Sequence, residues 1–210
     1  MTQSYYTKTD FTFKGDVKQI FIESYENPGS LDNTETGKKL SSDKKVFIND
    51  KGRIDSIYYY HHGELGLRTI FEIEENLKSK EIVYSHSDGS IQKTITHTHK
   101  QGNEFEFVTL DAGNRIAEKG VKFIENDLVL KEQYDYYGTT KYKTDFKYDD
   151  ENRLLLQIRI RENTDLIYDI SYKYLAFDKN GNWTQRLIMH KNEEGAITFS
   201  SFEISKYEYY

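Results

Sequence analysis

Apolar and polar side chains alternate with a period of two residues over short segments of this chain. Between residues 142 and 148, Tyr142, Phe146 and Tyr148 occupy one set of alternate positions, and lysine or aspartate occupies the other set. A two-residue period places the two sets on opposite faces of a β-strand. Helical periodicity is not sustained anywhere, so the pattern predicts strands with one apolar face and one charged face.

Polar turn motifs separate these strand segments. In the segment 148–154, Tyr148 ends one apolar run, a stretch of Asp, Glu and Asn follows, and Leu154 opens the next run. Asp and Asn side chains hydrogen-bond to the nearby backbone and tolerate left-handed conformations, so they favour a chain reversal. Variants of the same motif begin at Phe47, Leu110 and Phe177.

The turn motifs recur at a near-constant interval. Between Glu75 and Thr164 the centres are 12 or 13 residues apart, which is room for a strand and a tight turn but not for a helical crossover. The longer gap between Lys51 and Glu75 predicts a further turn near His62 and Gly63. The remaining centres are expected near Asp88, Gln101, Gly113, Asn126, Gly138, Glu151, Asn180 and Glu194.

This spacing predicts an all-β fold, an up-and-down antiparallel meander of about 10–14 strands. An open twisted sheet rarely carries so many strands, so we expect the meander to curl into a barrel, a half-barrel or a spiral shell. We expect one domain over residues 1–210, with N-terminal strands and a long loop in 1–45 and hairpin repeats in 46–210. The loop is predicted from Glu26 to Lys45 and contains the sole proline, Pro28.

Composition adds constraints on class and partners. The apolar fraction is only 36%, but 18 Tyr and 12 Phe argue for a folded, sheet-rich protein rather than a disordered one. The chain has no cysteine, which excludes disulfides and thiolate metal sites. A net charge of −6 with interspersed Lys and Arg argues against a nucleic-acid partner.

No apolar run reaches the length of a membrane helix or of a signal-peptide core, so no membrane insertion is expected. The sequence as given indicates a cytoplasmic location. If a signal peptide has been removed, the expected location is the periplasm or the cell surface.

The recurring motif of aromatic, Asp, two variable residues, Gly and Asn or Arg resembles the YD repeats of the RHS family. It is most similar to the short, Tyr-rich YD-repeat-like proteins of Bacteroidetes. The resemblance implies a shell of β-hairpins that acts as a scaffold or binding surface, without shared chemistry. The residues that carry the C-terminal copy are Phe177, Asp178, Gly181, Asn182 and Trp183, followed by Glu208, Tyr209 and Tyr210.

One constellation suggests a metal site. A four-residue turn over 100–103 would place His99 opposite Glu104 and His97 opposite Glu106, with all four side chains on one face of a hairpin. Two imidazoles and one carboxylate on adjacent strands can bind a divalent metal, with Glu106 as a fourth ligand or a supporting group. The alternative is a pair of His–Glu contacts on a solvated face.

Aromatic and imidazole side chains are also concentrated near one predicted turn. Alternation sends Tyr58 and Tyr60 to one face, followed by His61 and His62 at the strand end. Tyrosine combines an apolar ring with a polar tip, so this cluster is a candidate surface for a partner. Packing within the sheet is the alternative interpretation.

The sequence contains no nucleophile elbow, phosphate loop or calcium-binding loop. It therefore favours a non-catalytic binding protein without a cofactor, in which a Tyr-rich sheet face binds a protein or a glycan. One specific hypothesis is an immunity-type inhibitor of a toxin. The alternative is a metal-binding β-barrel protein or metal-dependent enzyme that uses His97, His99 and Glu104.

Overall fold

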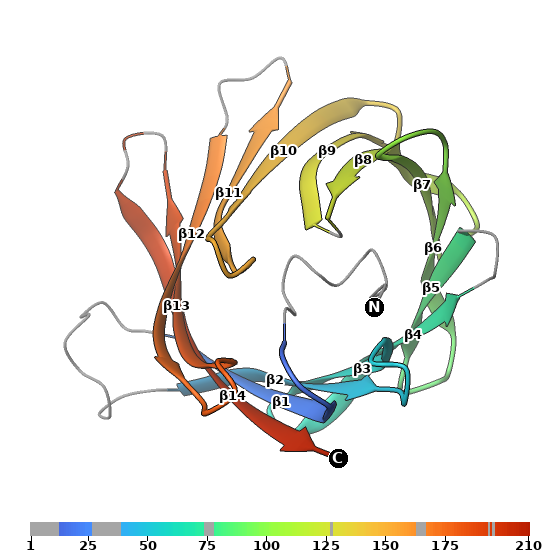
Figure 1. Cartoon of the computed structure of the whole chain (residues 1–210). Coiled ribbons are helices and arrows are strands. Elements are labelled where there is room, and N and C mark those ends of the chain that lie inside the picture. Colours follow the sequence, from blue (N-terminus) through green and yellow to red (C-terminus); the bar gives the residue numbers. More distant parts are fainter. Residues whose placement is uncertain are drawn as a thin grey trace.

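In the part of the chain that the structure describes, fourteen β-strands join edge to edge into a closed barrel (Figure 1). Each strand pairs antiparallel with the next strand in the sequence, and β1 closes the ring by pairing with β14. The strands are β1 (Val17–Glu26), β2 (Lys39–Ile48), β3 (Ile54–His61), β4 (Glu64–Ile73), β5 (Lys78–Ser85), β6 (Ile91–His99), β7 (Glu104–Asp111), β8 (Ile116–Glu125), β9 (Leu128–Tyr136), β10 (Thr140–Tyr148), β11 (Leu154–Arg161), β12 (Ile167–Phe177), β13 (Trp183–Lys191) and β14 (Ile197–Tyr209).

This computed structural model describes residues 13–26, 39–73, 78–126, 128–162, 167–192, 194 and 196–210. The described part of the chain contains no helix with the length and apolar character needed to cross a membrane.

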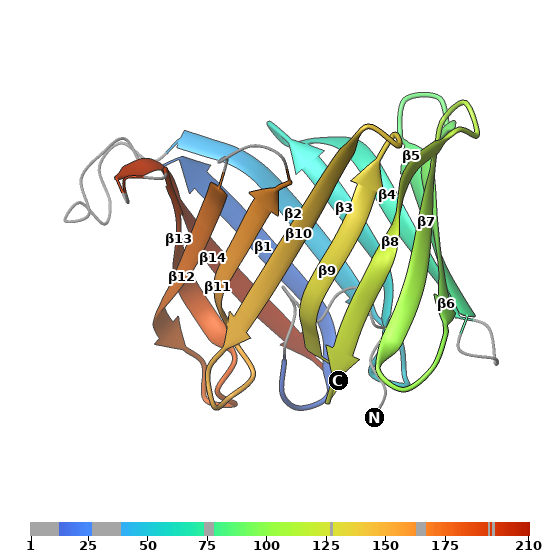
Figure 2. The ribbon, with the colours of Figure 1, turned by 90° about the horizontal axis from the view of Figure 1, so that it is seen from above.

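The predicted all-β antiparallel meander is confirmed, and of the three shapes expected from the strand number, the barrel is the one that forms. The strands are tilted relative to the barrel axis (Figure 2), as closure of a twisted sheet requires. Because β1 and β14 pair with each other, neither terminal strand presents an unpaired row of backbone groups.

A single carboxylate organises the reversal between β10 and β11. Asp149 Oδ1 accepts hydrogen bonds from the backbone N–H groups of Glu151 and Arg153, each at 2.9 Å. The backbone N–H of Asn152 donates to the carbonyl of Asp149 at 2.9 Å, and Asn152 has a φ of 64°. The motif read from the sequence is therefore a side-chain-capped turn with one left-handed residue.

The same turn recurs around the barrel. Side-chain oxygens of Asn49, Asp111 and Asp178 each accept from the backbone N–H groups two and four residues later. A β-bulge lies beside each of these turns, which adds local twist. The turn predicted near His62 is a two-residue turn with positive φ at both positions, as tight hairpins require. The turn near Gly138 has three residues, 137–139, with positive φ at Tyr137 and Gly138.

The predicted turn centres are confirmed wherever the structure describes them, and those near Glu75 and Thr164 lie outside the described residues. The predicted loop from Glu26 to Lys45 is too long, because β2 begins at Lys39. Lys39 pairs with Glu26, so pairing with β1 extends the strand through a polar segment that has no apolar alternation. Pro28 lies outside the described residues.

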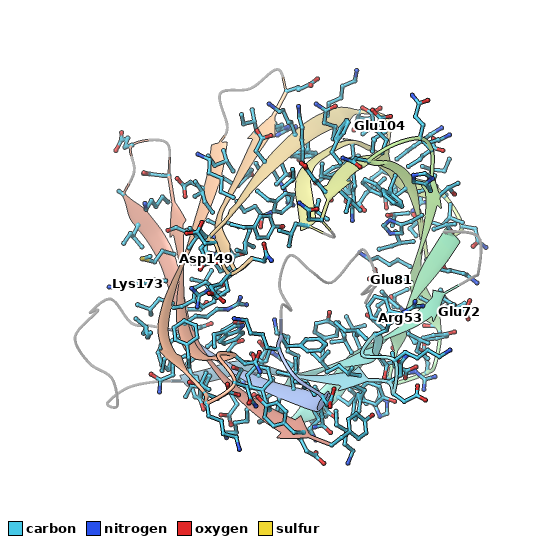
Figure 3. All side chains as sticks on the ribbon, in the orientation of Figure 1. Arg53, Glu72, Glu81, Glu104, Asp149 and Lys173 are labelled. Carbon is cyan, nitrogen blue, oxygen red and sulfur yellow. The ribbon has the colours of Figure 1, made fainter. Side chains whose placement is uncertain are left out.

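The two faces of the sheet become the inner and outer walls of the barrel. Glu81 points into the barrel, whereas Glu72 and Lys173 point away from it (Figure 3). Residues directly opposite each other on paired strands share a face, so the register assigns the other strand residues to one wall or the other.

Alternate turns gather at opposite ends of the barrel. We call the end that carries Tyr210 and the turns 49–53, 100–103, 149–153 and 178–182 the C-terminal rim. The other end, with the turns near 62–63, 86–90 and 112–115, is the opposite rim.

Two apolar clusters pack toward the C-terminal rim. The larger includes Ile20, Val46, Ile54 and Trp183, and it joins β1–β4 to β13. The smaller consists of Phe105, Ile124 and Val129, with Phe146 packed against it, and lies on β7–β10. Burial of these side chains supplies the main apolar stabilisation of the barrel.

The middle of the inner wall is polar. Arg186 is 1% exposed, and its Nη2 lies 2.6 Å from a carboxylate oxygen of Glu203, which is 5% exposed. Glu203 also accepts from the Ser24 hydroxyl at 3.0 Å and lies 3.7 Å from Lys44 Nζ. Such a buried charge pair is tolerated because its partners replace the lost hydration.

A row of rings crosses the inner wall over β6–β10. His97 lies 5.8 Å from Phe107, Phe107 lies 6.1 Å from Tyr134, and Tyr134 stacks on Tyr142 at 5.2 Å. Gly120 of β8 stands between Phe107 and Tyr134 in the register. Its missing side chain lets the two rings meet across the strand.

We predict that Gly120→Ala lowers stability by roughly 1–3 kcal/mol, the usual cost of overpacking. A Cβ at this position lies 2.1 Å from the Gln133 carbonyl oxygen and 2.5 Å from Tyr134 Cβ. Gly66→Ala is the matched control, since its Cβ lies 3.9 Å from the nearest atom, the Tyr59 carbonyl oxygen. Thermal unfolding of both variants measures the difference, and equal midpoints contradict the packing argument.

A second prediction concerns the turn between β7 and β8. Hydrogen bonds from the backbone and side chain of Arg115, and from the backbone N–H of Gly113, lower the pKa of Asp111 from 3.8 to about 2. Because the folded pKa lies below the unfolded one, this carboxylate stabilises the fold above about pH 4, and the contribution is lost as the pH falls toward 2. Asp111→Asn should therefore lose stability near neutral pH and flatten the acid limb of the pH–stability curve. Parallel acid limbs for the variant and the parent protein contradict this assignment.

Candidate functional site

A pocket of about 810 Å³ opens at the C-terminal rim, between the two apolar clusters. Turn residues form most of its wall, and Phe13, Val17, Leu128 and Trp183 form its apolar part. The remaining lining residues are Lys14, Gly15, Asp16, Asn49, Asp50, Lys51, Gly52, Asn126, Glu151, Asn152, Arg153, Gly181, Asn182 and Tyr210.

Asn182 holds the segment before β1 against this pocket. Its Oδ1 accepts from the Lys14 backbone N–H at 2.6 Å, and its Nδ2 donates to the Lys14 carbonyl at 2.9 Å. The same Nδ2 donates to the Tyr209 hydroxyl at 2.8 Å. Asn182 is 2% exposed, so these bonds satisfy a buried amide and join the segment before β1 to the end of β14.

The charges at the pocket are balanced. Three cations (Lys14, Lys51 and Arg153) and three carboxylates (Asp16, Asp50 and Glu151) line it. Lys14 forms an ion pair with Glu151, and the hydrogen bond and charge of Lys14 lower the pKa of the Glu151 carboxyl. Arg153 is paired through Nε with the turn carboxylate of Asp149 at 2.6 Å.

The adjoining carboxylate of Asp178 stays ionised for a local reason. Burial acts to raise its pKa, but hydrogen bonds from the Tyr209 hydroxyl and from the backbone N–H groups of Asn182 and Asn180 outweigh burial and lower the pKa. Asp178 therefore remains an acceptor that fixes the pocket wall rather than a group that exchanges protons near neutral pH.

Beneath the pocket, Trp183 rests on the buried ion pair of the inner wall. The Arg186 guanidinium lies 4.3 Å from the Trp183 ring and 5.3 Å from the Tyr172 ring. Burial acts to raise the pKa of Glu203, but the charges of Lys44 and Arg186 outweigh it and lower the pKa. Trp183 is 3% exposed, so it is a wall of the pocket rather than an exposed platform.

The predicted pairing of the metal candidates is wrong by one residue. His99 lies opposite Phe105, and His97 lies opposite Phe107, instead of opposite Glu104 and Glu106. Lys100 N–H donates to the Glu104 carbonyl, so Lys100 occupies a position in the ladder that the prediction gave to the turn. This shift sends Glu104 to the outer wall and leaves both imidazoles on the inner wall.

The two imidazoles also have different surroundings. His97 is 2% exposed, and burial, together with the charge of Lys122, lowers its pKa well below the usual value. His99 Nε2 lies 2.9 Å from the Gly102 carbonyl oxygen. Within the ranges that the structure describes, no group of three or more His, Cys, Asp or Glu is placed to hold a metal ion.

The candidate partner-binding cluster lies at the end of β3. Tyr58 and Tyr60 share the outer wall, as the alternation predicts, with Tyr58 against Phe47 at 5.1 Å and Lys45 Nζ 5.4 Å from the Tyr60 ring. His61 and His62 are exposed at the opposite rim. The structure does not bring this cluster to the pocket, and a partner for it stays a prediction.

Comparison with known proteins gives a likeness in fold. A porin-like protein from Bacteroides uniformis has a TM-score of 0.55 and 9% sequence identity, over 93% of this chain and 99% of that chain. The two proteins share a fold. A porin-like protein from Bacteroides vulgatus matches with a TM-score of 0.43 and 9% identity, over 93% of this chain and 99% of that chain. No protein-family model matches the sequence, and no curated protein matches it.

The sequence predicted the turns that line the pocket, but it did not predict that they lie together at one end of the barrel. A signal was present, since every second turn of an up-and-down meander returns to the same end. Turns 49–53, 149–153 and 178–182 obey this rule. The contribution of the segment before β1 had no sequence signal, because it depends on the bonds between Lys14 and Asn182.

We predict that Asn182→Ala releases the segment before β1 and lowers stability by roughly 1–3 kcal/mol, because buried partners of the amide lose their hydrogen bonds. Amide hydrogen exchange of residues 14–17 should become faster, while exchange in β6–β8 stays unchanged. Lys179→Ala, at an exposed position of the same turn, is the control. Unchanged exchange at residues 14–17 in Asn182→Ala refutes the proposed link.

Proposed function

We propose that this protein is a non-catalytic binding barrel that works in water and takes a neutral polar ligand, a glycan, into the pocket at the C-terminal rim. The observation that carries the proposal is the lining of that pocket. It combines balanced charges, amides and apolar side chains in about 810 Å³, a size and chemistry typical of small-molecule sites.

Individual groups at the pocket suit a sugar. Asn126 and Asn152 are exposed at the mouth, and their side chains can both donate and accept hydrogen bonds. Tyr210 also lines the pocket and is 69% exposed, although its hydroxyl donates to the Ile48 carbonyl at 3.2 Å. An exposed ring and amides in one pocket offer an apolar face and polar contacts, and a pyranose has an apolar face and hydroxyl groups that match them.

The outer wall supports a protein surrounded by water. Ion pairs occur at several places around it, namely Lys206–Glu23 at 3.2 Å, Lys80–Glu72 at 3.5 Å, Lys119–Glu106 at 3.8 Å and Lys143–Asp145 at 3.3 Å. Lys173 also points outward (Figure 3). A barrel in lipid carries an outward apolar band roughly 25 Å tall, and a Lys or Arg at its midplane costs about 2–4 kcal/mol.

The second candidate is a channel in a membrane, and the likeness in fold to a porin-like protein favours it. Both candidates use the same closed sheet, and they differ in what the outer wall contacts. The sequence-based prediction of no membrane insertion belongs to the first candidate and stays a proposal.

Two narrower ideas from the sequence also stay predictions. A toxin or another protein could be the partner instead of a glycan, because the barrel offers outer surface as well as a pocket. The resemblance to YD repeats is supported by the recurrence of the capped turn at Asp111, Asp149 and Asp178.

The binding test uses isothermal titration calorimetry with neutral oligosaccharides, namely maltotriose, cellotriose and chitotriose. We expect one of them to bind, and Tyr210→Ala to weaken that binding about tenfold, equivalent to about 1.4 kcal/mol. Lys179→Ala, on the same rim but outside the pocket lining, should bind like the parent protein. The glycan proposal fails if none of the three binds or if Tyr210→Ala has no effect.

The membrane test uses the same protein without detergent. The binding barrel should stay monodisperse in detergent-free buffer and give no conductance steps when added to planar lipid bilayers. Reproducible steps, together with flotation on liposomes, identify the channel instead.

A further inference from the structure

A group of tyrosines on the inner wall of β9–β12 lies around Arg159. The group, which we call the tyrosine strip, consists of Tyr134, Tyr136, Tyr142, Tyr168 and Arg159. Tyr142 lies opposite Tyr134, and Arg159 lies opposite Tyr168. These strands are neighbours in the barrel (Figure 1). On β10, Thr144 lies opposite Arg159, and a second arginine, Arg161, lies opposite Tyr142.

Solvent reaches this part of the inner wall. Tyr136 is 43% exposed and Tyr168 is 45% exposed. Both stand near the opposite rim, away from the apolar clusters, because Tyr136 ends β9 and Tyr168 lies at the start of β12. Tyrosine rings that remain accessible can receive a planar or pyranose ligand.

Arg159 is half-buried and has no carboxylate partner among the residues that the structure describes. Its Nε donates to the Thr144 hydroxyl at 3.3 Å, and its guanidinium lies 6.0 Å from the Tyr134 ring. A half-buried cation with only a hydroxyl and a ring beside it keeps hydrogen-bond donors for an anion.

The nearby carboxylates on the inner wall contact other side chains. Glu132 lies 3.4 Å from Lys122 Nζ, and Glu118 accepts from the Thr109 hydroxyl at 2.8 Å. Glu132 is therefore paired with Lys122, and neither carboxylate forms an ion pair with Arg159. This contrasts with Arg186 on the same wall, whose charge Glu203 neutralises at 2.6 Å.

We infer that the tyrosine strip is a binding site for an acidic saccharide, in which sugar rings stack on the tyrosines and a carboxylate pairs with Arg159. A guanidinium binds a carboxylate through two parallel hydrogen bonds, which fixes the orientation of the sugar. The site is separate from the pocket at the C-terminal rim, and it does not depend on the function proposed for that pocket.

The probe is a hyaluronan tetrasaccharide, and the matched probe is the same tetrasaccharide with its carboxyl groups reduced to alcohols. Calorimetry on the parent protein should show the acidic form binding at least about tenfold more tightly, a difference of about 1.4 kcal/mol. The preference should shrink as salt is raised, because the contact is ionic. Equal affinity for the two forms, or no binding of the acidic form, overturns the proposal.

Variants of Arg159 and Lys173 test whether the acidic saccharide binds at the tyrosine strip. Arg159→Gln should abolish the preference for the acidic form, and Arg159→Lys should keep part of it. Lys173→Gln removes one positive charge from the outer wall (Figure 3) and should leave the preference intact. If Arg159→Gln keeps the preference for the acidic form, the tyrosine strip is not the binding site. The same conclusion follows if Lys173→Gln loses the preference to the same extent. Circular dichroism checks each fold, and because the comparison of the two probes needs no variant, a misfolded Arg159→Gln does not remove the test.

Discussion

The barrel depends on the need to pair every backbone edge of a long meander. The fourteen strands of the described residues form one sheet with two terminal strands. An unpaired terminal strand exposes a row of N–H and C=O groups that attracts other chains. Pairing between β1 and β14 removes both edges at once. Closure also creates the inner wall, gathers alternate turns at each rim, and brings the two ends of the described chain together at Asn182.

Closure of the barrel also places polar side chains on the inner wall. A small barrel fills its interior with apolar side chains, but a barrel of this size has more inner wall than two apolar clusters cover. The middle of the wall is instead stabilised by local pairing. Arg186 with Glu203 and Lys122 with Glu132 are the clearest examples, and in each pair the neighbouring charge offsets the cost of burial. Arg159 departs from this rule, because its contacts are the Thr144 hydroxyl and the Tyr134 ring rather than a carboxylate.

Turn chemistry links the sequence directly to the architecture. One Asp or Asn oxygen accepts two backbone N–H groups, and a residue with positive φ completes the reversal. The bulge beside such turns adds twist that a tilted, closed sheet needs. These contacts are local, so they are encoded within about five residues, and the interval between them sets the strand length.

The sequence by itself therefore determined the strands, the turns and the meander, because alternation and turn capping act over a few residues. It did not determine the register between β6 and β7, where one extra ladder position at Lys100 moves Glu104 and Glu106 away from the histidines. Nor did it predict the start of β2 at Lys39, which pairing with β1 imposes on a polar segment. Only the tertiary structure decided that the sheet closes, that residues from four turns and both ends of the described chain share one pocket, and that Arg159 faces inward among tyrosines. These features depend on contacts between residues far apart in the chain, and alternation along one strand carries no information about them.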